Sequence, residues 1–206
     1  MAGYLLLGIV AVALIFLSVQ HDFKFSGGKN IWNSILFQYY SYFSSFKYIP
    51  LLGGLVLGIS QYFPETVEKR IKLTYHLPIN ENKVLLQMMG YGTLILLACF
   101  LLLFIFFWGM SANYFPREIV NSALISITPW FLSGFTAYYL IGLIVLEPIW
   151  RYRFFYLLVS AFFISIYLQR SINGVYSTMN VTLCITTVCT SIALLFSGYR
   201  FRKGEQ

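Results

Sequence analysis

The charged side chains that could bind a partner gather in one short segment, residues 64–83, between two long apolar stretches. Six of them are Glu65, Glu68, Lys69, Arg70, Lys72 and His76. Each of the two glutamates stands four residues before a lysine, and this order, with the acid N-terminal, favours side-chain pairs along one face of a helix. Such a face can bind a partner protein through charge-assisted contacts.

Two prolines predict where this helix begins and ends. Pro64 suits the first turn, where its missing N–H group is no loss, and Pro78 cannot continue a helix. Three apolar residues recur every four positions on another face: Val67, Ile71 and Tyr75. The pattern predicts an amphipathic helix over residues 64–76 that lies on a membrane surface.

The composition is that of an integral membrane protein. Apolar residues make up 59% of the 206 residues, charged residues only 10%, and the mean hydropathy is +0.74, which is outside the range of soluble domains. The formal charge is +7, but the basic residues flank apolar stretches and form no stripe. They are topology signals, and we expect no binding to nucleic acid.

Six apolar stretches could cross a bilayer as helices. They cover about residues 2–18, 48–63, 84–108, 119–146, 154–168 and 180–198, within a single transmembrane domain of residues 1–206. The expected fold is an all-α integral membrane protein with six transmembrane helices and a short amphipathic helix between the second and third. The residues from 21 to 47 are expected to form a loop whose aromatic part, residues 31–46, lies at the lipid headgroups.

The basic residues predict the orientation of the chain. If the N-terminus is cytoplasmic, nine lysine and arginine side chains lie on the inner side of the membrane and five on the outer side. Basic residues are enriched on the cytoplasmic side of membrane proteins. We therefore expect both termini and the 64–83 segment in the cytoplasm.

Small and hydroxyl-bearing residues mark faces of several helices. Gly54 and Gly58 form a small-xxx-small pair, which allows close approach of a helix from the same chain or from a second copy. Two hydroxyl stripes are expected to face the interior, for packing or along a translocation path: Ser122, Ser126 and Ser133, and Thr178, Thr182, Thr186 and Thr190. The three cysteines lie in apolar stretches and are expected to pack as small apolar side chains.

Two residues interrupt the fourth apolar stretch. Pro129 removes a backbone hydrogen bond and should kink the helix, and Thr128, Ser126 or a water could satisfy the freed carbonyl. Glu147 precedes two nearby arginines. A structural ion pair at the membrane edge is therefore favoured over a gating role for this carboxylate.

The order of these features resembles a known arrangement. A span, Pro64-Glu65, a charged amphipathic helix, Leu77-Pro78, a short polar link and the next span are similar to the cytoplasmic loop between the second and third spans of ABC exporter permeases of the six-span type-two class. In that family, the loop helix docks into a groove on the ATPase subunit and passes its motion to the membrane. The resemblance implies a multi-pass permease of the bacterial inner membrane that works with a second permease copy or a similar subunit. It also implies that the ATPase subunit contacts Glu65, Glu68, Lys69, Arg70, Lys72 and His76.

The remaining residues give no sign of an enzyme. The chain has no G-x-x-x-x-G-K-[ST] stretch, no histidine cluster and no plausible Ser-His-Asp set, so we expect no catalytic, cofactor or metal site, and ATP hydrolysis would need a separate subunit.

A surface helix between two spans also occurs in unrelated membrane proteins. The alternative function is therefore a membrane anchor or assembly subunit that transports nothing.

Overall fold

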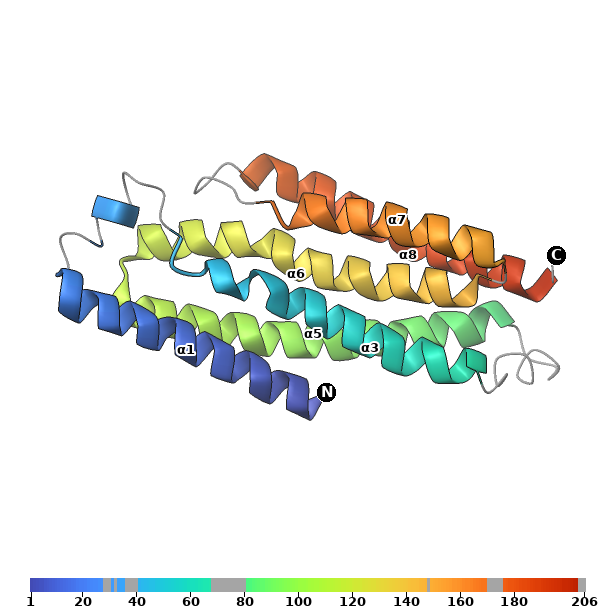
Figure 1. Cartoon of the computed structure of the whole chain (residues 1–206), viewed down its shortest axis with the longest axis horizontal. Coiled ribbons are helices and arrows are strands. Elements are labelled where there is room, and N and C mark those ends of the chain that lie inside the picture. Colours follow the sequence, from blue (N-terminus) through green and yellow to red (C-terminus); the bar gives the residue numbers. More distant parts are fainter. Residues whose placement is uncertain are drawn as a thin grey trace.

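The computed structural model describes residues 1–27, 31, 33–35, 41–67, 81–147, 149–169 and 176–203. These residues form helices and no strand, which confirms the predicted all-helical class for this part of the chain. Six long helices run roughly along one axis (Figure 1): α1 (Ala2–Ser26), α3 (Tyr48–Val67), α5 (Glu81–Tyr114), α6 (Arg117–Leu146), α7 (Trp150–Tyr167) and α8 (Tyr176–Lys203). A short 3₁₀ helix, η1 (Ser44–Lys47), leads directly into α3.

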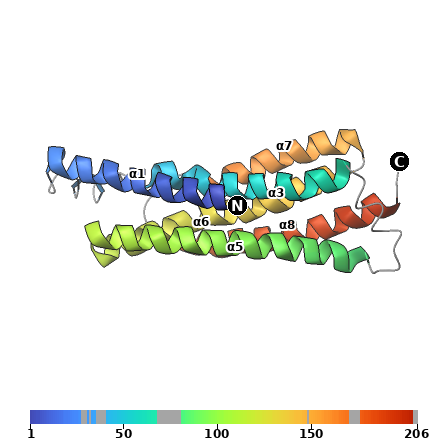
Figure 2. The same ribbon diagram turned by 90° about the horizontal axis from the view of Figure 1, so that it is seen from below.

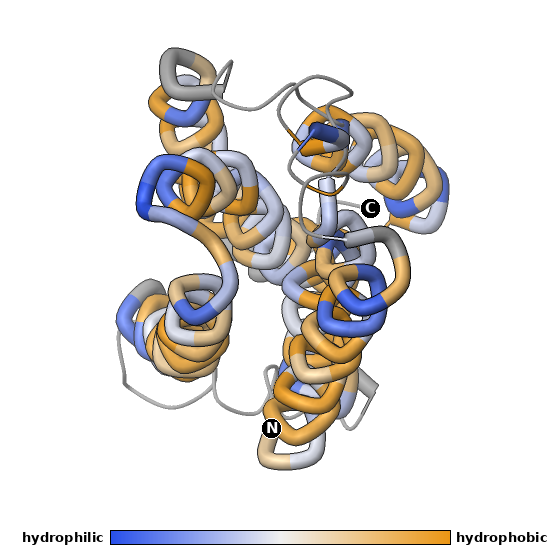
Figure 3. The backbone as a smooth tube through the Cα atoms, turned by 90° about the vertical axis from the view of Figure 1, so that its left-hand side faces the viewer, coloured by the Kyte–Doolittle hydropathy of each residue, from blue (hydrophilic) through white to orange (hydrophobic). Residues whose placement is uncertain are grey.

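Four segments are long and apolar enough to cross a membrane: Ala2–Phe25, Lys83–Tyr114, Arg117–Leu146 and Met179–Ser197. By length and composition, these four helices are compatible with a multi-pass membrane protein. α3 and α7 are less apolar, because α3 carries Gln61 and Glu65 near its end and α7 carries two arginines and three tyrosines. Seen end-on, the helices are largely apolar along their lengths (Figure 3).

α6 is the central helix. In its most apolar stretch 72% of the residues are buried, compared with 17 to 28% in the other three segments that could cross a membrane. It packs most extensively against α3 and α8 and also contacts α5 and α7 (Figures 1 and 2). α6 is therefore in contact with most of the other helices of the bundle.

α3 lies against α6 at glycines. A Cβ atom at Gly54 would collide with the main-chain carbonyl of Gly134, and one at Gly58 would lie 3.1 Å from the side chain of Ile141. Small residues allow two helix backbones to approach in this way. Both glycines of the small-xxx-small pair thus face another helix of the same chain.

α1 is longer than the predicted span of residues 2–18. It continues through His21 and Lys24, which are compatible with a helix, and it ends where Gly27 takes a φ of +72°. This left-handed conformation is easiest for glycine, which commonly terminates helices. Met1 lies about half-way along the long axis of the bundle, and α1 runs from there to one end (Figures 1 and 2).

Aromatic residues between α1 and α3 belong to the core where the structure describes them. The rings of Tyr42 and Phe115 stack with centroids 4.5 Å apart, and those of Phe46 and Phe107 lie 5.5 Å apart. Burial raises the pKa of Tyr42 to about 12, and its hydroxyl lies 3.4 Å from that of Ser111. These aromatic side chains pack into the core of the bundle, and their position at the level of the lipid headgroups stays a prediction.

The two ends of the bundle gather different connections. One end, here called the α3–α5 end, holds the last turn of α3, the first turn of α5, the link from α6 to α7 and the end of α8 (Figure 1). The opposite end holds the end of α1 and the two-residue link between α5 and α6. The described parts of the segment predicted to bind a partner, residues 64–67 and 81–83, lie at the α3–α5 end.

Candidate functional site

Glu65 is the one predicted partner-binding residue that the structure describes. It lies in the last turn of α3 and is half-buried. The others, Glu68, Lys69, Arg70, Lys72 and His76, lie outside the described residues.

The sequence predicted that Pro64 begins a new helix, and this prediction is wrong. Pro64 lies inside α3, which continues to Val67. The missing N–H of Pro64 frees the carbonyl of Ser60. Ser60 itself is an exposed residue. The hydroxyl of Thr66 also donates to the carbonyl of Tyr62 at 2.6 Å. The charged segment therefore starts as a direct extension of α3.

Next to this end, α3, α5 and α6 share a hydrogen-bond network. The side-chain amide of Gln61 donates to the carbonyl of Met88 at 2.7 Å, and its Oε1 accepts from the hydroxyl of Tyr138 at 2.9 Å. The hydroxyl of Tyr62 donates to that of Tyr138 at 3.0 Å. Both tyrosines are fully buried, and buried polar groups need such partners. We call this set the Gln61 network.

α5 is shaped to fit the Gln61 network. A Cβ atom at Gly92 would collide with the hydroxyl of Tyr138 and lie 2.5 Å from Oε1 of Gln61. The hydroxyl of the next residue, Thr93, lies 3.0 Å from that of Tyr139. Tyrosine hydroxyls of α6 therefore reach α5 at two adjacent positions, Gly92 and Thr93.

A second network joins α6, α7 and α8. The hydroxyl of Tyr167 donates to the carbonyl of Leu183 at 3.1 Å, and it lies 2.6 Å and 3.1 Å from the hydroxyls of Thr186 and Thr187. Thr187 in turn lies 3.1 Å from Thr136 of α6. α6 is thus hydrogen-bonded to neighbours on both sides.

The hydroxyl groups of Ser126 and Ser133, in the serine stripe, bond to main-chain carbonyls of α6 itself. Ser126 and Ser133 are buried and Ser122 is half-buried. The hydroxyl of Ser126 donates to the carbonyl of Ser122 at 2.9 Å, and that of Ser133 donates to the carbonyl of Trp130 at 2.6 Å. Hydroxyl groups in helices often bond in this way, and here it satisfies them within α6.

The threonine stripe of α8 is only partly turned inward. Thr182 is exposed, Thr186 and Thr190 are half-buried, and the side chain of Thr178 lies outside the described residues. The buried line of α8 is offset from this stripe and consists of Leu183, Thr187, Leu194 and Ser197. Thr187 does not belong to the predicted threonine stripe, yet its hydroxyl makes a hydrogen-bond contact with α6.

The carbonyl freed by Pro129 is satisfied from another helix. This carbonyl belongs to Ile125, four residues earlier, and it accepts a hydrogen bond from Nδ2 of Asn180 in α8 at 3.3 Å. Thr128 and Ser126, the side chains that the sequence had suggested, instead donate to the carbonyls of Leu124 and Ser122. The break in α6 has therefore become a contact between helices.

Glu147 follows the last turn of α6 and is fully buried. Nε of Arg153 donates to the main-chain carbonyl of Glu147 at 2.6 Å, and Nη2 lies 3.4 Å from the carbonyl of Val145. A cation at the C-terminus of a helix is favoured by the helix dipole. The arginine expected near the carboxylate thus holds the carbonyls at the end of α6.

Sequence reasoning missed the polar residues that join the helices. Gln61, Tyr62, Tyr138 and Tyr167 lie in stretches that were counted as apolar, because tyrosine scores as an aromatic residue. An amide beside tyrosines in such a stretch is the signal that could have found them, because buried polar groups usually bond to one another.

The site consists of neutral hydrogen-bonding groups that join α3, α5, α6, α7 and α8. Within the described ranges, no group of three histidine, cysteine, aspartate or glutamate side chains could hold a metal ion. No family model matches this chain, and no curated protein and no solved structure is similar to it.

Proposed function

We propose that this chain is the membrane-spanning permease subunit of an ATP-driven exporter, and that it couples to a separate ATPase subunit through the segment of residues 64–76. The observation that carries the proposal is the position of Gln61. Its amide joins the end of α3 to α5 and α6, about one helical turn before the charged segment. A force applied to that segment would therefore act on three helices together.

The networks provide a route for such a force. Movement of α3 relative to α5 would either carry Tyr138 along or break its hydrogen bonds to Gln61 and Tyr62. Because Tyr138 belongs to the central helix, the movement would then reach α7 and α8 through Thr136 and Tyr167. Buried hydrogen bonds favour a few discrete arrangements of helices over a continuous range, as alternating access requires.

The proposal extends to all six helices as membrane spans. α3 and α7 pack against α6, so helix contacts compensate for their lower apolarity. Large apolar side chains are exposed on α7 and α8, including Phe155, Phe162, Ile185 and Ile192. Such surfaces suit lipid or a second permease copy, and the basic residues favour both termini in the cytoplasm of the bacterial inner membrane.

Charge reversal tests the coupling segment. Glu65→Lys combined with Glu68→Lys should leave membrane insertion and expression near normal, because both residues lie beyond residue 63, where the predicted second span ends. Reversing desolvated interface charges typically costs about 2 to 5 kcal/mol, so co-purification of the ATPase subunit and substrate-linked ATP hydrolysis should be lost. Glu118→Lys, an exposed position at the other end of the bundle, is the matched control. A doubly reversed protein that still carries an active ATPase would exclude this segment as the coupling element.

A further inference from the structure

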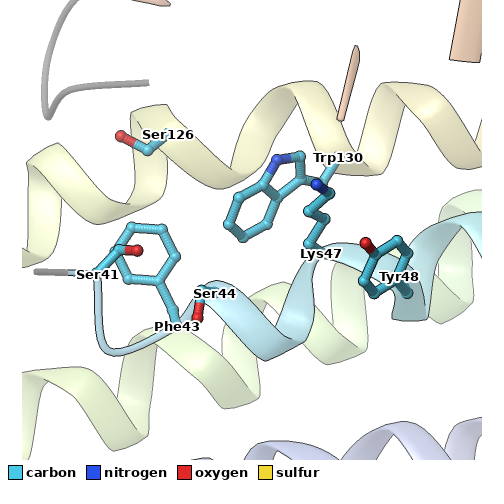
Figure 4. A pocket seen from close by; sticks show the side chains of 7 residues that line it. All are labelled: Ser41, Phe43, Ser44, Lys47, Tyr48, Ser126 and Trp130. Atoms are coloured by element: carbon cyan, nitrogen blue, oxygen red, sulfur yellow. The ribbon is translucent and has the colours of Figure 1, made fainter. Parts of the chain in front are cut away.

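A small cavity opens between the start of α3 and the middle of α6. It encloses about 70 Å³ and is lined by Ser41, Phe43, Ser44, Lys47, Tyr48, Ser126 and Trp130 (Figure 4). A water needs roughly 10 to 15 Å³ on this measure, so the cavity has room for a few waters or one small polar group.

Trp130, which lines the cavity, carries a hydrogen-bond donor that lacks an acceptor among the described residues. Trp130 is only 4% exposed, and its indole Nε1 is buried with no hydrogen-bond partner in the described part of the chain. An unmade hydrogen bond of this kind is costly, and buried polar groups are nearly always paired. Because the indole nitrogen can only donate, its missing partner must be an acceptor.

The other polar groups favour an acceptor with negative charge. Lys47 is half-buried and extends towards α6 and Trp130 (Figure 4), and its amine lies 5.2 Å from the centre of the Tyr48 ring. None of the seven lining residues is acidic, and Ser41 and Ser44 add hydroxyl groups. The cavity also lies at the N-terminus of the 20-residue α3, where the helix dipole favours an anion.

The surroundings of the cavity favour a lipid as the source of that anion. Tyr48, Leu52 and Val56 follow one another at four-residue intervals along α3 and are 54%, 47% and 51% exposed. An acyl chain could lie along this apolar face while its headgroup enters the cavity. We propose that the cavity binds the phosphate group of an anionic membrane lipid, held by the Lys47 amine and the Trp130 indole. The proposal does not depend on an ATPase partner.

Native mass spectrometry of the delipidated full-length chain tests this assignment with four added compounds. Phosphatidylglycerol supplies the phosphate with acyl chains, diacylglycerol supplies the chains alone, inorganic phosphate supplies the anion alone, and phosphatidylcholine supplies a zwitterionic phosphate. Phosphatidylglycerol should be retained about tenfold more tightly than diacylglycerol, the factor that corresponds to one charge-assisted contact. Tighter binding of inorganic phosphate than of phosphatidylglycerol would contradict a lipid as the source of the anion. Equal retention of diacylglycerol and phosphatidylglycerol would contradict a phosphate site.

Variants locate the binding. Lys47→Gln should weaken phosphatidylglycerol about tenfold and Trp130→Phe about fivefold. Lys24→Gln and Trp108→Phe, which change exposed residues outside the cavity, should leave binding unchanged. Melting curves show whether Trp130→Phe folds. Lys47→Gln alters only a half-buried side chain, so its binding can be interpreted even where Trp130→Phe does not fold. Unchanged binding in Lys47→Gln, or a density map of the lipid-loaded protein with water alone beside Trp130, would overturn the proposal.

Discussion

Gly92 of α5 lies so close to Tyr138 of α6 that a single added methyl group would collide with the tyrosine hydroxyl. The contact lets the phenol reach Oε1 of Gln61 on α3. Three helices thus meet where one of them lacks a side chain, and the close approach sets the geometry of the Gln61 network.

Gly92→Ala should destabilise the protein. The new methyl group must displace Tyr138 or Gln61, and overpacking of a buried site typically costs about 1 to 3 kcal/mol. Thermal unfolding in detergent measures the effect. Gly90→Ala is the control, since a Cβ atom there meets nothing within 4 Å and alanine favours the helix. Equal melting temperatures for the two variants would contradict the close contact.

Tyr62 and Tyr138 should be energetically coupled. Tyr62→Phe and Tyr138→Phe each remove one hydroxyl of the 3.0 Å pair, so the double variant should lose less stability than the single variants together. The expected coupling energy is about 1 kcal/mol, that of one buried hydrogen bond. A double-mutant cycle by thermal or denaturant unfolding measures it, and additive losses would show that the two hydroxyls do not interact.

Asn180 should matter only because of Pro129. Asn180→Leu leaves the carbonyl of Ile125 without its donor and should cost about 1 to 3 kcal/mol. In a Pro129→Ala background the alanine N–H can bond to that carbonyl, so Asn180→Leu should then cost distinctly less. The comparison uses unfolding of four proteins: the original chain, the two single variants and the double variant. The same loss in both backgrounds would mean that Asn180 acts elsewhere.

Two threonines of α8 should respond differently to leucine. Thr187 is buried and bonded to Thr136 and Tyr167, so Thr187→Leu should lower stability by about 1 to 3 kcal/mol. Thr182 is exposed, and Thr182→Leu should be neutral within about 0.5 kcal/mol. Melting temperatures of the two variants test the assignment of the inward face, which a reversed order would contradict.

The sequence predicts the helical class and much of the helix placement, because apolar length and composition depend on local residues. It does not predict which face of α8 is buried, since Thr182 and Thr187 differ only in what packs beside them. Nor does it identify Asn180 as the partner of Ile125, because their meeting depends on how two helices cross. Pro64 shows the same limit: a proline can begin a helix or lie near its end, and here it lies near the end of α3.

The coupling proposal concerns a separate subunit, so the most direct measurement is purification of the unmodified chain from its native membrane. The chain should be captured through a tag in mild detergent, and its partners identified by mass spectrometry. The proposal predicts an ABC-type ATPase in fixed ratio to the chain, with ATP hydrolysis that responds to an added amphiphile. Repeated recovery of the intact, folded chain in complexes that contain no such ATPase would contradict the permease function and favour a membrane anchor or assembly subunit.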